Sequence, residues 1–175
     1  WLDNLGLEIP TTYKELEAVL QAFKDKDADG DGDPNNEIPY SYCGSLNMDA
    51  RHILAPFGTV VSRQGNYMGI DKNGEPFYLP ITENYKEAVK WMHNLYKKGI
   101  IDQEHFTQNS SMLTAKIQAS GGSQVGYIFG WTAEAAAGIN ADEFVPMVAV
   151  AGPDGNRYVE SDPSYLDIQT NQCKV

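Results

Sequence analysis

The sequence predicts an α/β fold in which helices predominate over a small mixed sheet. Apolar residues recur at helical spacing in residues 12–24 and 82–98. Short apolar runs at residues 38–42 and 124–129, bounded by glycine, proline or polar residues, are typical of strands. Because strands alternate with helices through most of the chain, the class is α/β. A length of 175 residues suits one domain or one lobe of a larger protein.

The first strong helix is predicted to begin at Thr12 and to run to about Lys24. Thr12 and Glu15 have the spacing of a capping box, in which each side chain accepts a backbone N–H of the other residue. An apolar face follows at helical spacing, formed by Leu16, Val19, Leu20 and Phe23. The helix is therefore expected to end immediately before the acidic segment at residues 25–37.

Residues 25–37 form an acidic segment that contains six carboxylates and one lysine. Compact folding of such a segment is opposed by Coulomb repulsion unless a cation neutralises it. The carboxylates occupy alternate residues with glycines between them, which lets a short loop surround a hard cation with oxygen atoms. Calcium takes six to eight such oxygens, so the segment is predicted to be a calcium-binding loop.

The segment follows the EF-hand pattern only in its first half. Asp27, Asp29 and Asp31 occupy positions 1, 3 and 5, and Gly32 occupies the sharp turn. Position 12 is Ile38 rather than glutamate, so the closing ligands are expected one or two residues early. The predicted ligands are Asp27, Asp29, Asp31, Asp33, Asn36 and Glu37. The plainer alternative is a solvated acidic loop.

The middle of the chain shows alternating strand and helix patterns. A strand at 38–42 is followed by a helix at 47–57 that Gly58 ends. Two apolar runs, 67–70 and 76–79, flank an Asn-Gly turn and predict a hairpin. The strongest helix is residues 82–98, with Gly99 after it and a predicted buried face of Tyr85, Val89, Met92, Leu95 and Tyr96.

The last third of the chain contains shorter elements. The sequence predicts a helix at 110–119, a strand at 124–129, a helix at 133–137 and a strand at 144–150. Residues 160–175 form a polar and poorly patterned tail. No internal repeat indicates a second domain, so residues 1–175 are expected to form a single domain.

Composition excludes several classes of function. The net charge of −11 and the pI near 4.5 argue against a nucleic acid partner, because the phosphates would be repelled. No apolar run has the length of about 18 to 20 residues that a membrane span needs. Cys43 and Cys173 lie in no metal-binding spacing, and whether they pair is left open.

No motif for catalysis is present. His52, His93 and His105 neighbour no nucleophile motif, and the sequence contains no G-x-S-x-G, H-E-x-x-H or phosphate-binding glycine loop. We therefore expect a binding protein rather than an enzyme. Two alternatives stay open: a calcium-stabilised glycoside hydrolase domain, and a calcium-dependent adhesion or scaffold module, which would need a second calcium loop.

Aromatic residues indicate a carbohydrate ligand, because sugars stack their apolar C–H faces on aromatic rings. Trp131 lies at a strand-to-helix junction, where ligand sites of α/β folds gather, and is the first candidate. Tyr127 and Phe129 are weaker candidates, because alternation along their strand is expected to bury at least one. Trp91 lies inside a strong helix and is expected in the core.

Three blocks of the sequence resemble a known family. They are residues 1–16 (WLDNLGLEIPTTYKEL), residues 27–39 (DADGDGDPNNEIP), and ILAPFG at 53–58 followed by YKEAVKWMHNLYKKGIID at 85–102. In this order and spacing they resemble the extracellular solute-binding proteins, family 1 and its lipoprotein relatives, of sugar-importing ABC transporters. Those proteins come from Gram-positive gut and soil bacteria.

The resemblance implies that residues 1–175 are part of one lobe of a two-lobed, periplasmic-binding-protein-like (type II) protein. The sugar or oligosaccharide would lie between the lobes, and ABC permease subunits would be the partners of a monomeric, cell-surface lipoprotein whose anchor lies outside this segment. The calcium ion is structural in the family, which carries over to Asp27, Asp29, Asp31, Asp33 and Glu37. The loop is one residue longer than usual, so Asn35 and Asn36 both remain candidates.

Overall fold

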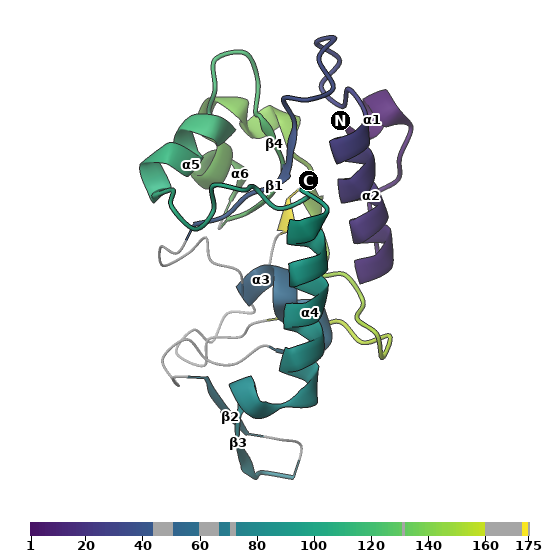
Figure 1. The fold of residues 1–175 in the computed structure, drawn as a ribbon, viewed down its shortest axis with the longest axis vertical. Coiled ribbons are helices and arrows are strands. Elements are labelled where there is room, and N and C mark those ends of the chain that lie inside the picture. Colours follow the sequence, from purple (N-terminus) through teal and green to yellow (C-terminus); the bar gives the residue numbers. More distant parts are fainter. Residues whose placement is uncertain (44–50, 60–66, 71–72, 131, 160–172, 175) are drawn as a thin grey trace.

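The fold is seen in a computed structural model that describes residues 1–175 except 44–50, 60–66, 71–72, 131, 160–172 and 175 (Figure 1). The helices are α1 Leu2–Leu5, α2 Tyr13–Asp25, α3 Arg51–Leu54, α4 Glu83–Lys97, α5 Ser110–Ile117 and α6 Ala133–Ala137. The strands are β1 Ile38–Tyr40, β2 Met68–Ile70, β3 Pro76–Tyr78, β4 Val125–Phe129, β5 Pro146–Met147 and β6 Cys173–Lys174. Short 3-10 turns cover Ala55–Phe57, Leu79–Ile81 and Gly138–Glu143.

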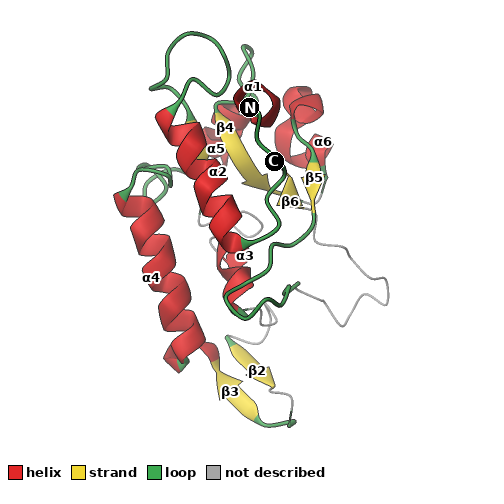
Figure 2. Ribbon diagram, turned by 90° about the vertical axis from the view of Figure 1, so that its right-hand side faces the viewer, coloured by secondary structure: helices red, strands yellow, loops and turns green. Residues whose placement is uncertain are grey.

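A small mixed sheet forms the centre of the fold, as the sequence predicts. Its strand order is β1-β4-β6-β5, with β1 parallel to β4 and β6 antiparallel to both of its neighbours. Figure 2 shows β6 between β4 and β5. β2 and β3 form a separate antiparallel hairpin, also as predicted, although part of its turn lies outside the described residues.

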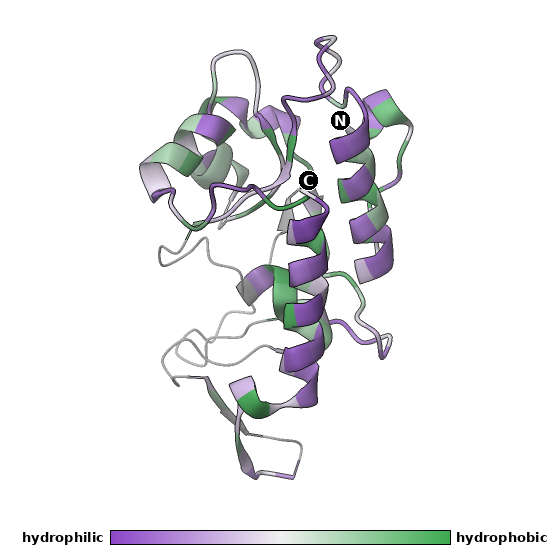
Figure 3. Ribbon diagram, viewed as in Figure 1, coloured by the Kyte–Doolittle hydropathy of each residue, from purple (hydrophilic) through white to green (hydrophobic). Residues whose placement is uncertain are grey.

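Two apolar cores lie on the two sides of the sheet. The first joins α2 and α4 to the sheet, and its fully buried residues include Leu20, Phe23, Tyr40 and Leu95. The second joins α5 and α6 to β4 and contains Leu113, Ile117 and Ile128. Figure 3 shows many hydrophilic residues along α4 on the side that faces the viewer. With helices packed on both sides of the sheet, the fold is a helix–sheet–helix arrangement, consistent with the predicted α/β class.

Helix α2 confirms the capping prediction in detail. The Thr12 hydroxyl accepts the Glu15 N–H at 3.2 Å, and the Glu15 carboxylate accepts the Thr12 N–H at 3.1 Å. The four predicted apolar positions, Leu16, Val19, Leu20 and Phe23, are all buried. The helix ends at Asp25, one residue beyond the prediction.

The buried face predicted for α4 is partly wrong. Val89 is 41% exposed, whereas Ala88, Trp91 and Leu95 are the buried residues of the helix. The face is therefore rotated toward the small Ala88, whose low apolar area gives a weak signal in the sequence. Trp91, predicted in the core, is buried and makes a T-shaped contact with Tyr13.

The strand predicted at 144–150 is also shorter than expected. Only Pro146–Met147 pairs in the sheet, while Ala151 bonds to the segment before α2, where its N–H donates to the Thr11 carbonyl. The predicted helix at 47–57 is seen from Arg51 onward as α3 and a 3-10 turn, and residues 44–50 lie outside the description. The elements that were not predicted are α1, β6 inside the poorly patterned tail, and the 3-10 turns at Leu79–Ile81 and Gly138–Glu143.

Candidate functional site

The acidic loop connects the end of α2 to β1, on the edge of the molecule. Helix α2 ends at Asp25, and the chain turns back at Gly30 (φ +81°) and Gly32 (φ +96°). Both values lie in the left-handed region that favours glycine. The two glycines therefore allow the loop to fold back on itself between consecutive carboxylates.

The carboxylates of this loop accept hydrogen bonds from the loop's own backbone. Asp27 accepts the N–H groups of Gly30 and Gly32 at 2.8 and 3.0 Å. Asp29 accepts the Asp31 N–H at 3.0 Å, and Asp31 accepts the Asp33 N–H at 2.8 Å. These bonds fix the loop's curvature and hold its oxygen atoms on the inside of the turn.

Glu37 differs from the other acidic residues of the loop because it is buried. Its side chain is only 6% exposed. One carboxylate oxygen, Oε1, accepts the Ala28 N–H at 2.7 Å. The other, Oε2, is buried and has no hydrogen-bond partner in the part of the chain that the structure describes. A buried carboxylate oxygen without a partner is costly, which makes this oxygen a candidate ligand atom.

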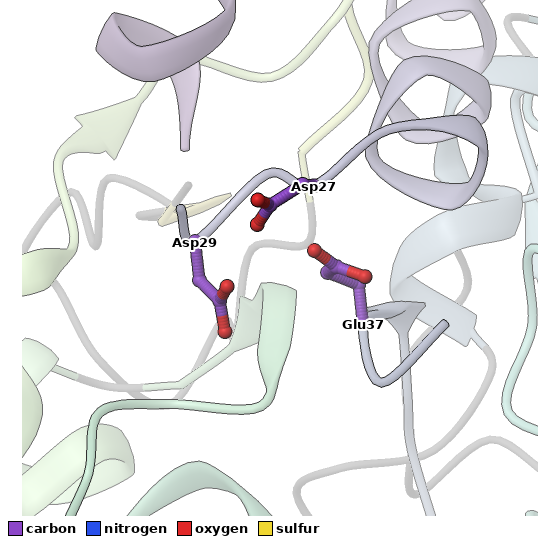
Figure 4. Close-up of side chains that lie close together, drawn as sticks. All are labelled: Asp27, Asp29 and Glu37. Atoms are coloured by element: carbon purple, nitrogen blue, oxygen red, sulfur yellow. The ribbon is translucent and has the colours of Figure 1, made fainter. Parts of the chain in front are cut away.

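Three carboxylates converge at this point. Oxygen atoms of Asp27, Asp29 and Glu37 lie within 4.8 Å of one another, and Figure 4 shows the three side chains around a shared space. Within the described residues no ion pair joins this loop to a lysine or arginine. Carboxylate oxygens at this density are the donor set of a hard cation such as calcium.

The other predicted metal ligands lie around this group rather than in it. Asp33 Oδ1 accepts both the backbone and the side-chain N–H of Asn35, each at 3.1 Å. The Asn36 amide donates to Asp31 Oδ2 at 2.7 Å. The structure thus brings Asp27, Asp29 and Glu37 together, while Asp31, Asp33 and Asn36 interact with neighbours within the loop.

One residue that supports the loop was missed at the sequence level. The side-chain amide of Asn4 donates to the Ala28 carbonyl at 3.0 Å and so ties α1 to the loop. Ala28 is itself fully buried beside Glu37. Asn4 is 24 residues from Ala28 along the chain, and no local pattern signals such a contact.

The aromatic candidates for a sugar site have different surroundings. Trp131 lies outside the described residues. Tyr127 is 3% exposed and packs against Tyr40, with 5.3 Å between the ring centroids. Phe129 is half-buried and its ring is stacked on that of His52. Tyr127 and Phe129 are two residues apart in β4 and therefore point to the same face of the sheet.

A second acidic group has a cation of its own. Asp102 is 8% exposed, and its Oδ2 accepts the Ser41 hydroxyl at 2.6 Å and Lys116 Nζ at 2.7 Å. Lys116 also bonds Glu104 at 2.8 Å and Gln108 at 3.1 Å. Burial raises the pKa of Asp102, but the hydrogen bonds from Lys116 and Ser41 outweigh it and hold that pKa below its ordinary value. This group is complete without a ligand.

Among the described residues, no helix has both the length and the apolar character that crossing a membrane requires.

Comparison with known proteins finds relatives of one kind. The chain is 33% identical over 160 residues to the fructooligosaccharide ABC transporter substrate-binding protein FusA of Streptococcus pneumoniae serotype 4, an alignment that covers 91% of this chain and 28% of FusA. It is 29% identical over 113 residues to the lipoprotein LipO of Bacillus subtilis, which covers 63% of this chain and 22% of LipO. No family model matches the chain.

Solved structures agree with the sequence relatives. An EF-hand mutant of FusA in complex with fructo-nystose matches 99% of this chain with a TM-score of 0.77 and 28% identity, over 34% of that structure. An extracellular solute-binding protein from Bifidobacterium longum subsp. infantis matches 99% of this chain with a TM-score of 0.80 and 26% identity, over 35% of that structure. This chain thus spans about a third or less of the proteins it matches. The resemblance and the fold class predicted from sequence are confirmed, and the relatives are binding proteins rather than enzymes.

Proposed function

We propose that this chain is a segment of the sugar-binding component of a bacterial ABC importer. The observation that carries the proposal is the 33% identity to FusA along 91% of the chain, supported by TM-scores of 0.76 to 0.80 with solute-binding proteins. The ligand of the whole protein is a sugar or oligosaccharide bound between two lobes. Residues 1–175 supply much of one lobe.

The sugar-contacting residues are proposed on chemical grounds. Trp131 is the first candidate, because an indole offers a flat apolar face to a sugar ring. Phe129 is half-buried, and its ring is stacked on that of His52. Tyr127 is buried in the core, so we expect it to shape the site from beneath. The closed two-lobed form would then be recognised by the permease subunits at the membrane.

Calcium is proposed as a structural ion of the acidic loop. Asp27, Asp29 and Glu37 would hold it, and Asp31, Asp33 and Asn36 are further candidates from the loop. The supporting observation is the buried oxygen of Glu37, which has no hydrogen-bond partner among the described residues and lies beside two other carboxylates. The ion would neutralise the loop and fix the end of α2 against β1. The EF-hand reported for FusA is consistent with this assignment.

The same relatives support a proposal for the location of the protein. LipO is a lipoprotein, and the Bifidobacterium relative is described as extracellular. We propose that the full protein is a monomeric lipoprotein on the surface of a Gram-positive bacterium, with its anchor outside this segment. Extracellular calcium is millimolar, which would saturate even a weak site.

Calorimetric titration of the full-length protein with kestose and a panel of other oligosaccharides tests the sugar proposal. We expect saturable binding of at least one oligosaccharide and no hydrolysis of any. Turnover of a sugar would favour the glycoside hydrolase alternative, and failure to bind any of the panel would contradict the proposal.

A thermal melt in EDTA and in a calcium series up to millimolar tests the metal proposal. A ligand that binds only the folded state stabilises it by mass action, so we expect a saturable rise in melting temperature. The double variant Asp29→Ala with Asp31→Ala should lose this rise and melt like the parent in EDTA. An equal loss in both buffers would show that the two residues act without calcium.

A further inference from the structure

A small cavity lies beside the carboxyl end of β4. Its volume is about 20 Å³, which is room for about one water molecule or one hydroxyl group. β1 and β4 are parallel, and ligand sites of open α/β sheets gather beyond the carboxyl ends of such strands. The cavity therefore lies at the edge of the sheet where a ligand is expected. The residues that line it are Leu16, His52, Ile53, Ala55, Pro56, Tyr127, Phe129, Ala149, Val150 and Tyr158.

The floor of this cavity is apolar and buried, whereas its rim is partly exposed. Leu16 and Ile53, which belong to the floor, are each 1% exposed. Phe129, at the end of β4, and Tyr158, beyond β5, are half-buried. The cavity is thus closed beneath and bordered by two aromatic rings that solvent reaches in part.

The Phe129 ring is fixed at this rim by a ring stack. The imidazole of His52, in α3, lies on it with 3.2 Å between the ring centroids and 10° between the planes. A sugar packs its apolar C–H face against an aromatic ring, and a ring that is already held in place loses little freedom when it does so. Phe129 therefore offers a pre-organised edge to a ligand at the rim.

Polar groups gather beside Tyr158, in the turn that precedes it. The Tyr158 hydroxyl donates to Asp154 Oδ2. The same carboxylate accepts the backbone N–H of Asn156 at 3.0 Å and its side-chain N–H at 2.9 Å. A phenol, a carboxylate and an amide are thus held together, and as a group they can both donate to and accept from the hydroxyls of a sugar.

Close backbone packing fixes this turn against the wall of the cavity. A Cβ on Gly152 would lie 1.6 Å from the Pro56 carbonyl oxygen, so a side chain there is incompatible with the approach of the two segments. A Cβ on Gly58 would lie 3.2 Å from the Tyr158 ring, which shows how closely that ring is packed. Tyr158 is therefore placed on the same cavity as Phe129 by the fold itself.

We propose that the rim of this cavity is a sugar subsite in which Tyr158 is a specificity-determining residue. A sugar ring would pack on Phe129 and Tyr158, one of its hydroxyl groups would enter the cavity, and Tyr158, Asp154 and Asn156 would bond further hydroxyls. This inference rests on the proposed function and extends its site. A site that bonds a ligand hydroxyl discriminates against an analogue that lacks it, because the polar groups of the site are then left unpaired.

Calorimetric titration of the full-length protein with the oligosaccharide panel tests the subsite. Tyr158→Phe keeps the ring and removes the hydroxyl, and we expect it to weaken binding about 3- to 10-fold, the range of one net hydrogen bond. Tyr78→Phe is the matched control, because Tyr78 lies in β3, is 44% exposed and does not line the cavity. It should bind as tightly as the parent.

The outcomes of this titration separate the subsite from the proposed function. If the parent binds an oligosaccharide and Tyr158→Phe binds it equally well, the cavity holds no more than a water molecule. The subsite is then overturned while the proposed function stands. If the parent binds none of the panel, the proposed function fails and the subsite fails with it.

Monodeoxy analogues of the oligosaccharide that binds distinguish a direct contact of Tyr158 from a purely structural role. We expect one analogue to bind the parent more weakly than the intact sugar does, yet to bind Tyr158→Phe as tightly as the intact sugar does, because both changes remove the same hydrogen bond. If Tyr158→Phe instead weakens the binding of the intact sugar and of every analogue by the same factor, Tyr158 only holds the turn in place. That result would overturn its assignment as a specificity-determining residue.

Discussion

Two buried carboxylates in this protein are compensated in different ways. Asp102 is 8% exposed and meets Lys116, Ser41 and a backbone N–H within its own fold. Glu37 is 6% exposed and meets one backbone N–H, while its second oxygen has no partner among the described residues. The first carboxylate is stabilised by the charged side chain of Lys116, and for the second we propose a cation from solution. The comparison predicts that only the second makes the stability of the protein depend on calcium.

Removing Lys116, the positive partner of Asp102, should have the largest effect on stability. Lys116→Met leaves Asp102 buried beside Ser41 without its positive partner, and we expect a loss of about 3 kcal/mol in the free energy of unfolding. Urea unfolding with and without calcium measures it, and the loss should be the same in both buffers. Lys90→Met is the matched control, because Lys90 and its partner Glu87 are more than half exposed and the pair should add nothing measurable. A calcium-dependent loss for Lys116→Met would break the distinction between the two groups.

Glu37→Gln, in contrast, should lower the stability of the protein only when calcium is present. The variant removes a charged ligand of the proposed calcium ion and should therefore weaken calcium binding. A ligand that binds only the folded state stabilises it by about 2.7 kcal/mol at one hundred times its Kd, and we expect this stabilisation to fall sharply. In EDTA the variant should be as stable as the parent or more so, because a buried, half-partnered charge has been removed. Asp25→Asn is the control, since Asp25 lies outside the carboxylate cluster and bonds Gln21. Equal losses for Glu37→Gln in calcium and in EDTA would exclude a metal role for Glu37.

The contrast between the acidic loop and the Asp102 group also shows which features could be predicted from the sequence. The acidic loop, the capping box at Thr12 and the β2–β3 hairpin are local patterns, and local patterns carry their own signals. The partners of Asp102 come from Ser41 and Lys116, 61 and 14 residues away, so no pattern in the sequence brings them together.

The same limit accounts for the elements that were missed. The described part of β6 is two residues long, and β4 and β5 lie on both sides of it and supply its pairing partners. The face of α4 was predicted from large apolar residues, yet the space above Phe57 and Tyr13 admits Trp91 beside the small Ala88 and leaves Val89 exposed. The burial of Glu37 is likewise a tertiary property. The metal and sugar residues therefore remain predictions. Geometry brings Asp27, Asp29 and Glu37 together among the metal candidates, whereas the first sugar candidate, Trp131, lies outside the described residues.

The dependence of stability on acid should test the interaction between Asp102 and Lys116. The pKa of Asp102 is held below its ordinary value in the folded state, so its contribution is present above the unfolded pKa of about 3.9 and is lost as the pH falls through the folded pKa. In EDTA, the parent should lose stability in this acid range more steeply than Lys116→Met, which lacks the interaction that lowers the pKa. Urea midpoints between about pH 2 and pH 5 measure this. Parallel pH profiles would mean that Lys116 does not set the pKa of Asp102.

The smallest loss of stability is expected for a carboxylate that is only partly buried. This prediction tests whether the loss increases with the burial of the carboxylate. Glu17 is 26% exposed and accepts Trp91 Nε1 and Lys98 Nζ, each at 2.7 Å. Burial raises the pKa of Glu17, and these two hydrogen bonds outweigh it and lower the pKa. Glu17→Gln keeps an acceptor for the indole but loses the charge, so we expect a loss of about 1 kcal/mol, independent of calcium. Trp91→Phe in the same background separates the hydrogen bond from the ion pair. A loss for Glu17→Gln as large as that for Lys116→Met would mean that burial of the carboxylate does not order these effects, and the comparison between Asp102 and Glu37 would then need another cause.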